Sequence, residues 1–388
     1  MQYSQRAQSV APFYAMAFGE RAAALEAAGK SVIRFNIGEP DFGAPPAVQA
    51  AMQQAISANE LPYTSALGTP ELRAAIAGFY QTQHGLTIAP NRVIVTAGAS
   101  AALLLVCAAL VDNGDEVMMG DPAYPCNRQF VTTFGGKVNL VPTDADSRFQ
   151  LTAALVKQLW QQDTKALMIA TPSNPTGTAV RAAELAAMCE FAKAHNAWRI
   201  IDEIYLNLSD GEHGAPQTAL AFDDDAIIIN SFSKYFGMTG WRLGWMVVPE
   251  SMVAVIERLA QNLYICPSTP AQIAAMACFT PDTLTLCEAR RESLLQRRRL
   301  VLDGLADIGL HVPVTPDGAF YVYIDISSTD LTAMTFCQRL LDEQGVALTP
   351  GNDFGNADAE KYVRLSYATS ESALVEGLAR IKMFVSTL

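Results

Sequence analysis

The chain contains the segment Asn230-Ser231-Phe232-Ser233-Lys234, followed by Gly237-Met238-Thr239-Gly240-Trp241-Arg242-Leu243-Gly244-Trp245. It starts at the end of an apolar, β-branched run at 226–231 and continues into a glycine-rich turn. A buried strand therefore delivers Lys234 into a turn. A lysine there needs a partner or a chemical role, and a desolvated lysine with a lowered pKa is a good Schiff-base nucleophile. The alternative is a structural lysine that forms a salt bridge on a loop.

Two neighbours of Lys234 suit a phosphate group. Ser231 offers a hydroxyl donor, and Arg242 offers the planar fork of a guanidinium. A second phosphate-binding segment lies upstream, where Gly98-Ala99-Ser100 begins a helix directly after a strand. The backbone N–H groups at such a helix start can cradle an anion.

Short apolar runs recur along the chain and alternate with helical patterns. The runs are 92–96, 115–119, 137–141, 165–170, 198–202, 226–231 and 243–248. Helical patterns such as Gly98–Val111 and Ala179–His195 lie between several of them. Strands separated by helices predict an α/β domain with a mainly parallel sheet.

Polar and aromatic side chains follow the ends of several runs. Asp202 ends one run and Tyr205 comes three residues later, while Asn174 follows the preceding run and Tyr124 lies in a turn after an earlier one. Ligands of open α/β sheets bind at the carboxyl ends of the strands. Asp202 could hold a heterocyclic nitrogen protonated, Tyr205 could hydrogen-bond a phenolate oxygen, and Tyr124 could stack on a planar cofactor.

The lysine segment resembles the signature of the fold-type I pyridoxal-phosphate enzymes, specifically the class I/II aminotransferase family, in which the arginine follows the Schiff-base lysine by eight positions. The resemblance extends from Ile37-Gly38-Glu39-Pro40-Asp41-Phe42 to Val363-Arg364-Leu365-Ser366, nearly the whole chain. It implies pyridoxal 5'-phosphate (PLP) as cofactor and a ping-pong transfer of an amino group from an L-amino acid to a 2-oxo acid. It also implies a large PLP-binding domain with a mainly parallel seven-stranded sheet between helices, and a smaller α+β domain built from both chain ends.

The resemblance assigns roles to individual residues. Lys234 forms the Schiff base and shuttles a proton, Asp202 pairs with the ring nitrogen, and Tyr205 hydrogen-bonds the ring oxygen. The remaining residues expected to bind the cofactor are Gly98, Ala99, Ser100, Tyr124, Asn174, Ser231, Arg242 and Tyr63. The residues expected to bind the substrate are Gly38, Asn174 and Arg364, of which Arg364 clamps the α-carboxylate.

Tyr63, in Tyr63-Thr64-Ser65-Ala66-Leu67-Gly68, resembles the family's tyrosine that reaches the phosphate of the neighbouring subunit. It implies a homodimer with active sites at the subunit interface.

The segment 261–266 lies near the substrate side chain in relatives. It has no arginine here, and this favours a neutral or aromatic amino donor over a dicarboxylic one. Arg128 or Arg34 could still supply such a charge.

Other functions compete with transamination. Cleavage of a carbon–sulfur bond by β-elimination, or decarboxylation, could occur on the same scaffold, because substrate orientation decides which Cα bond breaks. A ligand-sensing transcription factor would need a DNA-binding domain, and only about thirty residues precede the strand at 32–37. A nicotinamide dehydrogenase is disfavoured, because no G-x-G-x-x-G follows a strand.

The chain is expected to divide into an N-terminal arm with part of the small domain at 1–45, a large PLP-binding domain at 46–275 and a small C-terminal domain at 276–388. Long helical patterns follow Pro249 at 250–263, 270–279 and 282–307, and short strands are predicted at Phe320–Ile326 and Tyr362–Ser366. The helix at 282–307 is dense in arginine, and we expect those arginines to form a solvated face.

The composition is that of an acidic globular protein. Of 388 residues, 50% are hydrophobic, and 27 Lys and Arg against 39 Asp and Glu give a formal net charge of −12. A chain this acidic repels nucleic acids and anionic membranes, so we expect neither as a partner. The uncharged stretch Val93–Val111 could span a bilayer by length, but the break at Thr96-Ala97-Gly98-Ala99-Ser100 predicts a buried strand, a tight turn and a buried helix.

The seven cysteines are scattered, and no two form a C-x-x-C pair. The four histidines lie far apart, which predicts no metal site. Met1–Val10 is polar and contains no apolar secretion segment. We therefore expect a cytoplasmic protein with reduced thiols.

Overall fold

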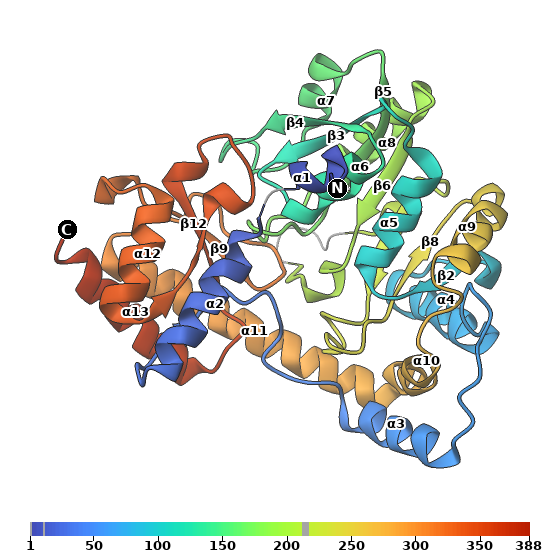
Figure 1. Ribbon diagram of the computed structural model, residues 1–388, viewed down its shortest axis with the longest axis horizontal. Helices are drawn as coiled ribbons and strands as arrows, with labels where there is room; N and C mark the ends of the chain where they lie inside the picture. The colour runs from blue at the N-terminus through green and yellow to red at the C-terminus, as the bar shows by residue number, and fades with distance from the viewer. Residues whose placement is uncertain (1, 11, 212–216) are drawn as a thin grey trace.

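One seven-stranded sheet organises the larger part of the molecule (Figure 1). The computed structural model describes residues 2–10, 12–211 and 217–388. The strands are β2 (Val93–Thr96), β3 (Glu116–Asp121), β4 (Lys137–Pro142), β5 (Thr164–Ala170), β6 (Trp198–Asp202), β7 (Ile227–Ser231) and β8 (Gly244–Val247). Their order is β2-β8-β7-β6-β5-β3-β4. Within the described chain, β8 is the strand that runs antiparallel to its neighbours, so the predicted mainly parallel sheet is confirmed.

Both faces of this sheet are covered, which is why its strands read as continuous apolar runs. Ile227 and Ile229 pack in one cluster with α5 (Ala99–Leu110) and α9 (Glu250–Leu263). Ile228 points the other way and packs in a cluster that includes α4 (Pro70–His84) and α8 (Ala182–Ala194). This alternation is the period of two that a strand imposes on its side chains. The remaining helices of this part of the chain are α3 (Pro46–Ala58), α6 (Pro125–Thr133), α7 (Ala153–Leu159) and α10 (Thr269–Ala275).

The uncharged stretch from Val93 to Val111 divides as predicted. Strand β2 ends at Thr96, Gly98 turns the chain with a φ of +85°, and α5 starts at Ala99. Strand β2 is buried throughout, and α5 buries one face, which includes Leu103 and Val106, while Leu104 on the opposite side is 37% exposed. In the described parts of the chain, none of the helices combines the length and the apolar character that crossing a membrane requires.

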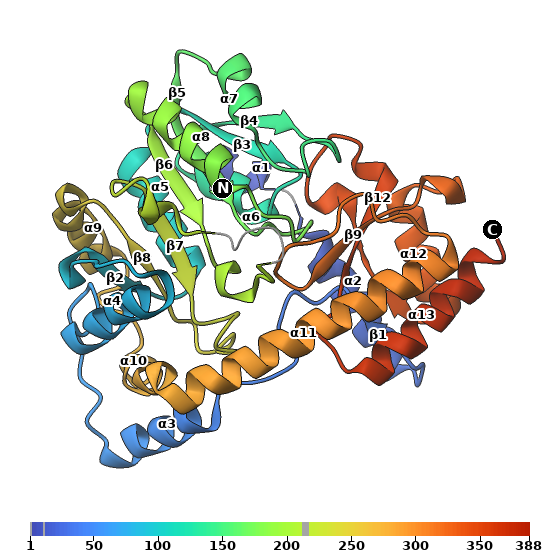
Figure 2. The same ribbon diagram turned by 180° about the vertical axis from the view of Figure 1, so that it is seen from behind.

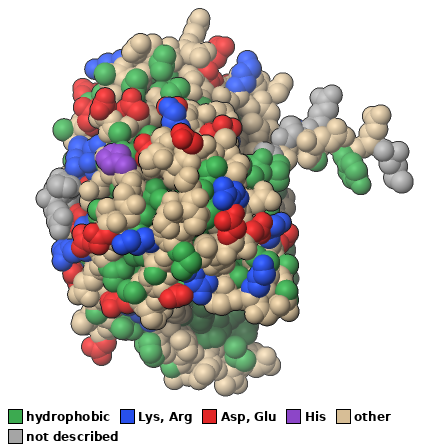
Figure 3. Space-filling view, turned by 90° about the vertical axis from the view of Figure 1, so that its left-hand side faces the viewer, with side chains coloured by type: hydrophobic (Ala, Val, Ile, Leu, Met, Phe, Trp, Pro, Cys, Tyr) green, Lys and Arg blue, Asp and Glu red, His purple; other side chains and the backbone are tan. Residues whose placement is uncertain are grey.

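The smaller part joins the two ends of the chain (Figure 2). Strand β1 (Ile33–Arg34) pairs in parallel with β10 (Val346–Ala347). A second sheet has the antiparallel order β11-β12-β9, with β11 (Thr349–Pro350), β12 (Tyr362–Ser366) and β9 (Tyr321–Asp325). The helices here are α2 (Tyr14–Ala27), α12 (Ala333–Gln344) and α13 (Glu371–Val385), whereas the N-terminal helix α1 (Gln5–Ser9) lies against α6 of the larger part. On the face that Figure 3 shows, acidic and basic side chains are interspersed.

The long helix α11 (Pro281–Ile308) connects the two parts. The prediction that its arginines form a solvated face is wrong for several of them. Arg298 is buried and donates hydrogen bonds to the Asp210 carboxylate at 2.5 Å and to a backbone carbonyl. Arg297 pairs with Asp41 at 2.8 Å. Both side chains bind groups in loops that are distant from the helix in sequence, and helical periodicity alone does not reveal such contacts.

Candidate active site

A cavity of about 570 Å³ lies where the carboxyl ends of the parallel strands face the small sheet. Most of the predicted site residues line it together. They are Gly38, Ala99, Ser100, Tyr124, Asn174, Asp202, Tyr205, Ser231, Lys234, Arg242 and Arg364. Of the other two, Gly98 adjoins the cavity through Arg242, and Tyr63 lies outside it.

Lys234 follows β7 in the glycine-rich turn, as the sequence predicts. Its Nζ atom donates a hydrogen bond of 2.6 Å to the backbone carbonyl of Gly38. Burial lowers the pKa of the Lys234 amine from 10.5 to about 8, although nearby Glu39 opposes the shift. A larger fraction of this amine is therefore uncharged near neutral pH than for an ordinary lysine.

Asp202 ends strand β6 and is buried. One carboxylate oxygen accepts a hydrogen bond of 3.1 Å from the backbone N–H of Ile204. Burial raises the pKa of Asp202 to about 6, while that hydrogen bond and the Lys234 charge act in the opposite direction. A cation placed beside this carboxylate would relieve the desolvation cost of its negative charge.

Arg364 on β12 is 2% exposed, so its charge is held almost wholly away from water. It donates to Oδ1 of Asn174 at 2.9 Å and to the backbone carbonyl of Asn36 at 2.7 Å. Within the described residues these partners are uncharged, and the Nε atom has no hydrogen-bond partner. A buried guanidinium without an anion is costly, and a carboxylate can satisfy it through two parallel hydrogen bonds.

The start of α5 and Arg242 form an anion cradle. The Gly98 N-cap provides no side-chain hydrogen bond, so the first N–H groups of α5 remain available. A Cβ atom on Gly98 would lie 2.6 Å from a guanidinium nitrogen of Arg242, so glycine permits their close approach. Ser231 lies beside this cradle, where its hydroxyl accepts a hydrogen bond of 3.0 Å from the Ser233 N–H and donates one of 3.3 Å to the Leu243 carbonyl, which a phosphate oxygen would have to replace. This set of donors suits a phosphate.

Tyr124 and Tyr63 differ in position. Tyr124 precedes α6 and presents its ring to the cavity, where Phe13 packs edge-on at a centroid distance of 6.2 Å. Tyr63 is 80% exposed and does not line the cavity of its own chain.

The two arginines considered for the substrate side chain both form hydrogen bonds within the chain. Arg34 lines the cavity but binds Glu26 at 2.9 and 2.6 Å, and Arg128 donates to the Asp353 carbonyl at 2.8 Å.

Sequence reasoning missed two groups of cavity residues. The first is Tyr321 on β9, whose hydroxyl lies 2.8 Å from that of Tyr205. The sequence predicts a strand at Phe320–Ile326, but no signal in it places that strand beside the cavity. The second group lies on and just before α2 and just after β1, and it consists of Phe13, Ala15, Met16, Gly19, Glu20, Ala23, Asn36 and Ile37.

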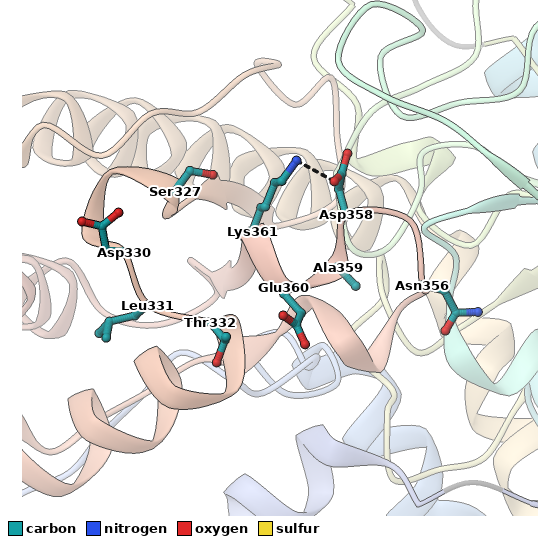
Figure 4. A pocket seen from close by; sticks show the side chains of 9 residues that line it. All are labelled: Ser327, Asp330, Leu331, Thr332, Asn356, Asp358, Ala359, Glu360 and Lys361. Atoms are coloured by element: carbon teal, nitrogen blue, oxygen red, sulfur yellow. Dashed lines mark ion pairs between the residues drawn. The ribbon is translucent and has the colours of Figure 1, made fainter.

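A second hollow, of about 490 Å³, lies on the smaller part and contains none of the predicted site residues (Figure 4). It is a surface depression between the loops at 327–332 and 356–361. Lys361 pairs there with Asp358 at 2.6 Å. In the described portion of the chain, no cluster of His, Cys, Asp and Glu side chains is arranged to hold a metal ion.

Comparison with known proteins defines the class of this protein as an enzyme that transfers amino groups. Residues 30–381 match the model of the aminotransferase class I and II family, and the chain belongs to that family. It is 40% identical over 374 residues to the valine–pyruvate aminotransferase of Mycobacterium tuberculosis, which covers 96% of each chain. It is 35% identical to the arginine–pyruvate transaminase of Pseudomonas aeruginosa over 100% of this chain and 99% of that protein.

Solved structures agree with this assignment. The crystal structure of an aminotransferase from Mycobacterium tuberculosis superposes with a TM-score of 0.96 at 39% identity, covering 100% of both chains. The fold class and the transferase activity inferred from the lysine segment are therefore confirmed. The comparisons favour transamination over the lyase and decarboxylase alternatives.

Proposed function

We propose that this aminotransferase holds PLP covalently on Lys234 and transfers an amino group from a neutral or aromatic L-amino acid to a 2-oxo acid by a ping-pong mechanism. The observation that carries the proposal is the meeting, in one cavity, of a lysine with a lowered pKa, a buried carboxylate at Asp202 and a buried guanidinium at Arg364. A nucleophile, an anion and a cation are the three groups that this chemistry needs.

The residues fit the cofactor. The N-terminus of α5, Arg242 and Ser231 would hold its phosphate, and the Tyr124 ring would stack on its heterocycle. Asp202, which has no ion-pair partner within the described residues, would keep the ring nitrogen protonated. PLP supplies an electron sink that stabilises negative charge on the substrate Cα.

The chain's own residues do the binding and the proton transfer. Lys234 alternates between the covalent link and a free amine, and the free amine carries the proton to and from Cα. Burial favours that role, because it keeps the amine largely uncharged above about pH 8. Arg364, with Asn174 and the Gly38 backbone nearby, would orient the substrate through its α-carboxylate.

The preference for a neutral or aromatic donor rests on the cavity mouth. Phe13, Met16 and Ile37 give it an apolar lining. The guanidinium of Arg34 is already paired with Glu26, so it does not offer a free charge to a distal carboxylate. The relative from Mycobacterium tuberculosis is named for valine and pyruvate, which agrees with a neutral donor.

We infer further that the enzyme is a cytoplasmic homodimer of amino-acid metabolism. Tyr63 is highly exposed in the single chain, and other exposed apolar side chains occur on α9, α10 and the residues that follow them; they include Leu263, Ile265 and Ile273. A partner that covered this surface could receive Tyr63 at its phosphate site. The seven cysteines are all free thiols, as in a reducing compartment.

Covalent trapping tests the proposal. The protein is incubated with PLP, reduced with borohydride and digested, and the labelled peptide is identified by mass spectrometry. The label is expected on Lys234. A label confined to other lysines would show that the cavity described above is not the cofactor site.

A further inference from the structure

A pair of tyrosines joins the two parts of the molecule inside the cavity. Tyr205 follows strand β6 of the large sheet, and Tyr321 begins strand β9 of the small sheet. Their hydroxyl oxygens lie 2.8 Å apart, and their rings meet edge to face at 82°. Both side chains are almost fully buried, at 3% and 0% exposure, so water does not replace the hydrogen bond between them.

The surroundings hold Tyr321 in this position. The guanidinium carbon of Arg364 lies 4.5 Å from the centre of its ring. On another side, a Cβ atom on Gly38 would come within 2.9 Å of the Tyr321 hydroxyl. Strand β9 is paired with β12 over five residues, with Tyr321 opposite Ser366. The hydroxyl therefore has a fixed location, and Tyr205 is its hydrogen-bond partner within the described residues.

The direction of this hydrogen bond matters for the cofactor. A tyrosine hydroxyl carries one proton, so Tyr205 can donate to the ring oxygen of PLP only if it accepts from Tyr321. A donor that itself accepts a hydrogen bond is strengthened. Burial raises the pKa of both tyrosines, which keeps both protons in place at neutral pH.

We propose that Tyr321 is a positioning residue of the transamination site, whose hydroxyl donates to Tyr205 and so directs the Tyr205 proton to the ring oxygen of PLP. This inference rests on the proposed function, because it assumes that PLP occupies the cavity. It also means that the small sheet, through β9, contributes to the electronic state of a cofactor bound mainly by the large sheet.

The readout is the pH at which the visible absorbance of bound PLP changes. That change marks loss of the proton held between the lysine nitrogen and the ring oxygen. A hydrogen bond to the ring oxygen stabilises the form that has lost this proton more than the form that keeps it. Once the proton is lost, it no longer offsets the negative charge on the oxygen. Removing the Tyr321 hydroxyl weakens that bond, so the midpoint of Tyr321→Phe is expected to rise by about 0.3 to 1 pH unit.

Four variants distinguish an effect of Tyr321 on the Tyr205 hydroxyl from a general loss of structure. Tyr205→Phe should raise the midpoint at least as much as Tyr321→Phe. The double variant should match Tyr205→Phe alone, because Tyr321 acts through Tyr205. The matched control is Tyr323→Phe, which removes a buried hydroxyl from the same strand but outside the cavity, and its midpoint should equal that of the wild type.

A fluorinated residue at position 321 keeps the test open if Tyr321→Phe does not fold. Replacing Tyr321 with 3-fluorotyrosine retains the shape and the hydroxyl of the side chain. The fluorinated hydroxyl is a stronger hydrogen-bond donor, so the midpoint pH of the PLP absorbance change should fall. A midpoint unchanged in Tyr321→Phe or in the 3-fluorotyrosine protein would overturn the inference. So would equal shifts from Tyr321→Phe in the wild-type and Tyr205→Phe backgrounds. If wild-type protein shows no PLP absorbance at all, the proposed function is wrong. If wild-type protein shows that absorbance but the midpoint does not move in the variants, only the inference about Tyr321 is wrong.

Discussion

The Nη1 atom of Arg364 lies 2.9 Å from Oδ1 of Asn174, so a guanidinium from the small sheet meets an amide from the loop after β5 of the large sheet. The amide orients the guanidinium without neutralising it. The positive charge thus remains buried and is available to a carboxylate that enters the cavity. This hydrogen bond joins the two parts of the molecule at the residue that we propose as the binding group for the substrate α-carboxylate.

Arg364→Lys keeps the charge but removes the planar fork. We expect kcat/KM to fall for every amino acid tested, by an amount on the order of 1 to 4 kcal/mol in transition-state stabilisation. The loss should be similar for short and long substrates, because all share the α-carboxylate. Arg21→Lys, in an exposed pair with Asp342, is the control and should leave kcat/KM unchanged. A loss confined to one class of substrate would reverse the orientation proposed for it.

The lowered pKa of Lys234 gives a pH dependence with a definite sign. The uncharged amine is the nucleophile, and burial places its pKa at about 8 rather than 10.5. The rate at which cofactor-free protein forms its covalent link to PLP should therefore rise with pH and level off above about pH 8 to 9. Stopped-flow absorbance over a range from about pH 6 to about pH 10 measures it. A rate that still rises steeply at the alkaline end would mean that the amine titrates as an exposed lysine.

Asp202→Asn should have opposite effects on stability and on activity. Burial raises the pKa of this carboxyl from 3.8 to about 6, so its charged form destabilises the cofactor-free fold once the pH rises through that window. At about pH 8 the amide should make the cofactor-free protein more stable by at most about 3 kcal/mol. With PLP present, the variant should retain some cofactor but lose most of its turnover, because nothing stabilises the ring cation.

Thermal unfolding of both proteins at about pH 4 and about pH 8, with and without PLP, checks this prediction. The advantage of the variant should be small at the acidic pH, where the wild-type carboxyl is mostly protonated. A variant with wild-type transamination rates would show that Asp202 has only a structural part.

Subunit complementation tests whether Tyr63 acts across an interface. Lys234→Ala and Tyr63→Ala chains should each be nearly inactive alone. Mixed dimers would contain one site with an intact Lys234 and a wild-type Tyr63 from the partner. Random exchange should restore about a quarter of wild-type activity, since half of the dimers are mixed and each has one complete site. No recovery, despite proven mixing, would place Tyr63 outside the phosphate site.

The sequence predicts the sheet well because its strands are buried on both faces, and an apolar, β-branched run as short as 226–231 fits a buried strand far better than a helix. It also predicts the groups at strand ends, since Asp202 is the last residue of one such run and Lys234 comes three residues after another. Tyr321 escaped prediction because its contact with Tyr205 depends on how the two sheets meet, which no local pattern encodes. The error over Arg298 has the same origin, since its partner Asp210 is distant in sequence.

A single half-reaction tests the proposed transamination through PLP on Lys234. Protein loaded with PLP is mixed with one amino acid at a time, without an oxo acid, and its absorbance is followed. Neutral or aromatic L-amino acids are expected to convert the PLP absorbance stoichiometrically to that of pyridoxamine phosphate and to release the matching 2-oxo acid. Persistent PLP absorbance with continuous release of pyruvate from a cysteine S-conjugate would instead identify a carbon–sulfur lyase and contradict the account.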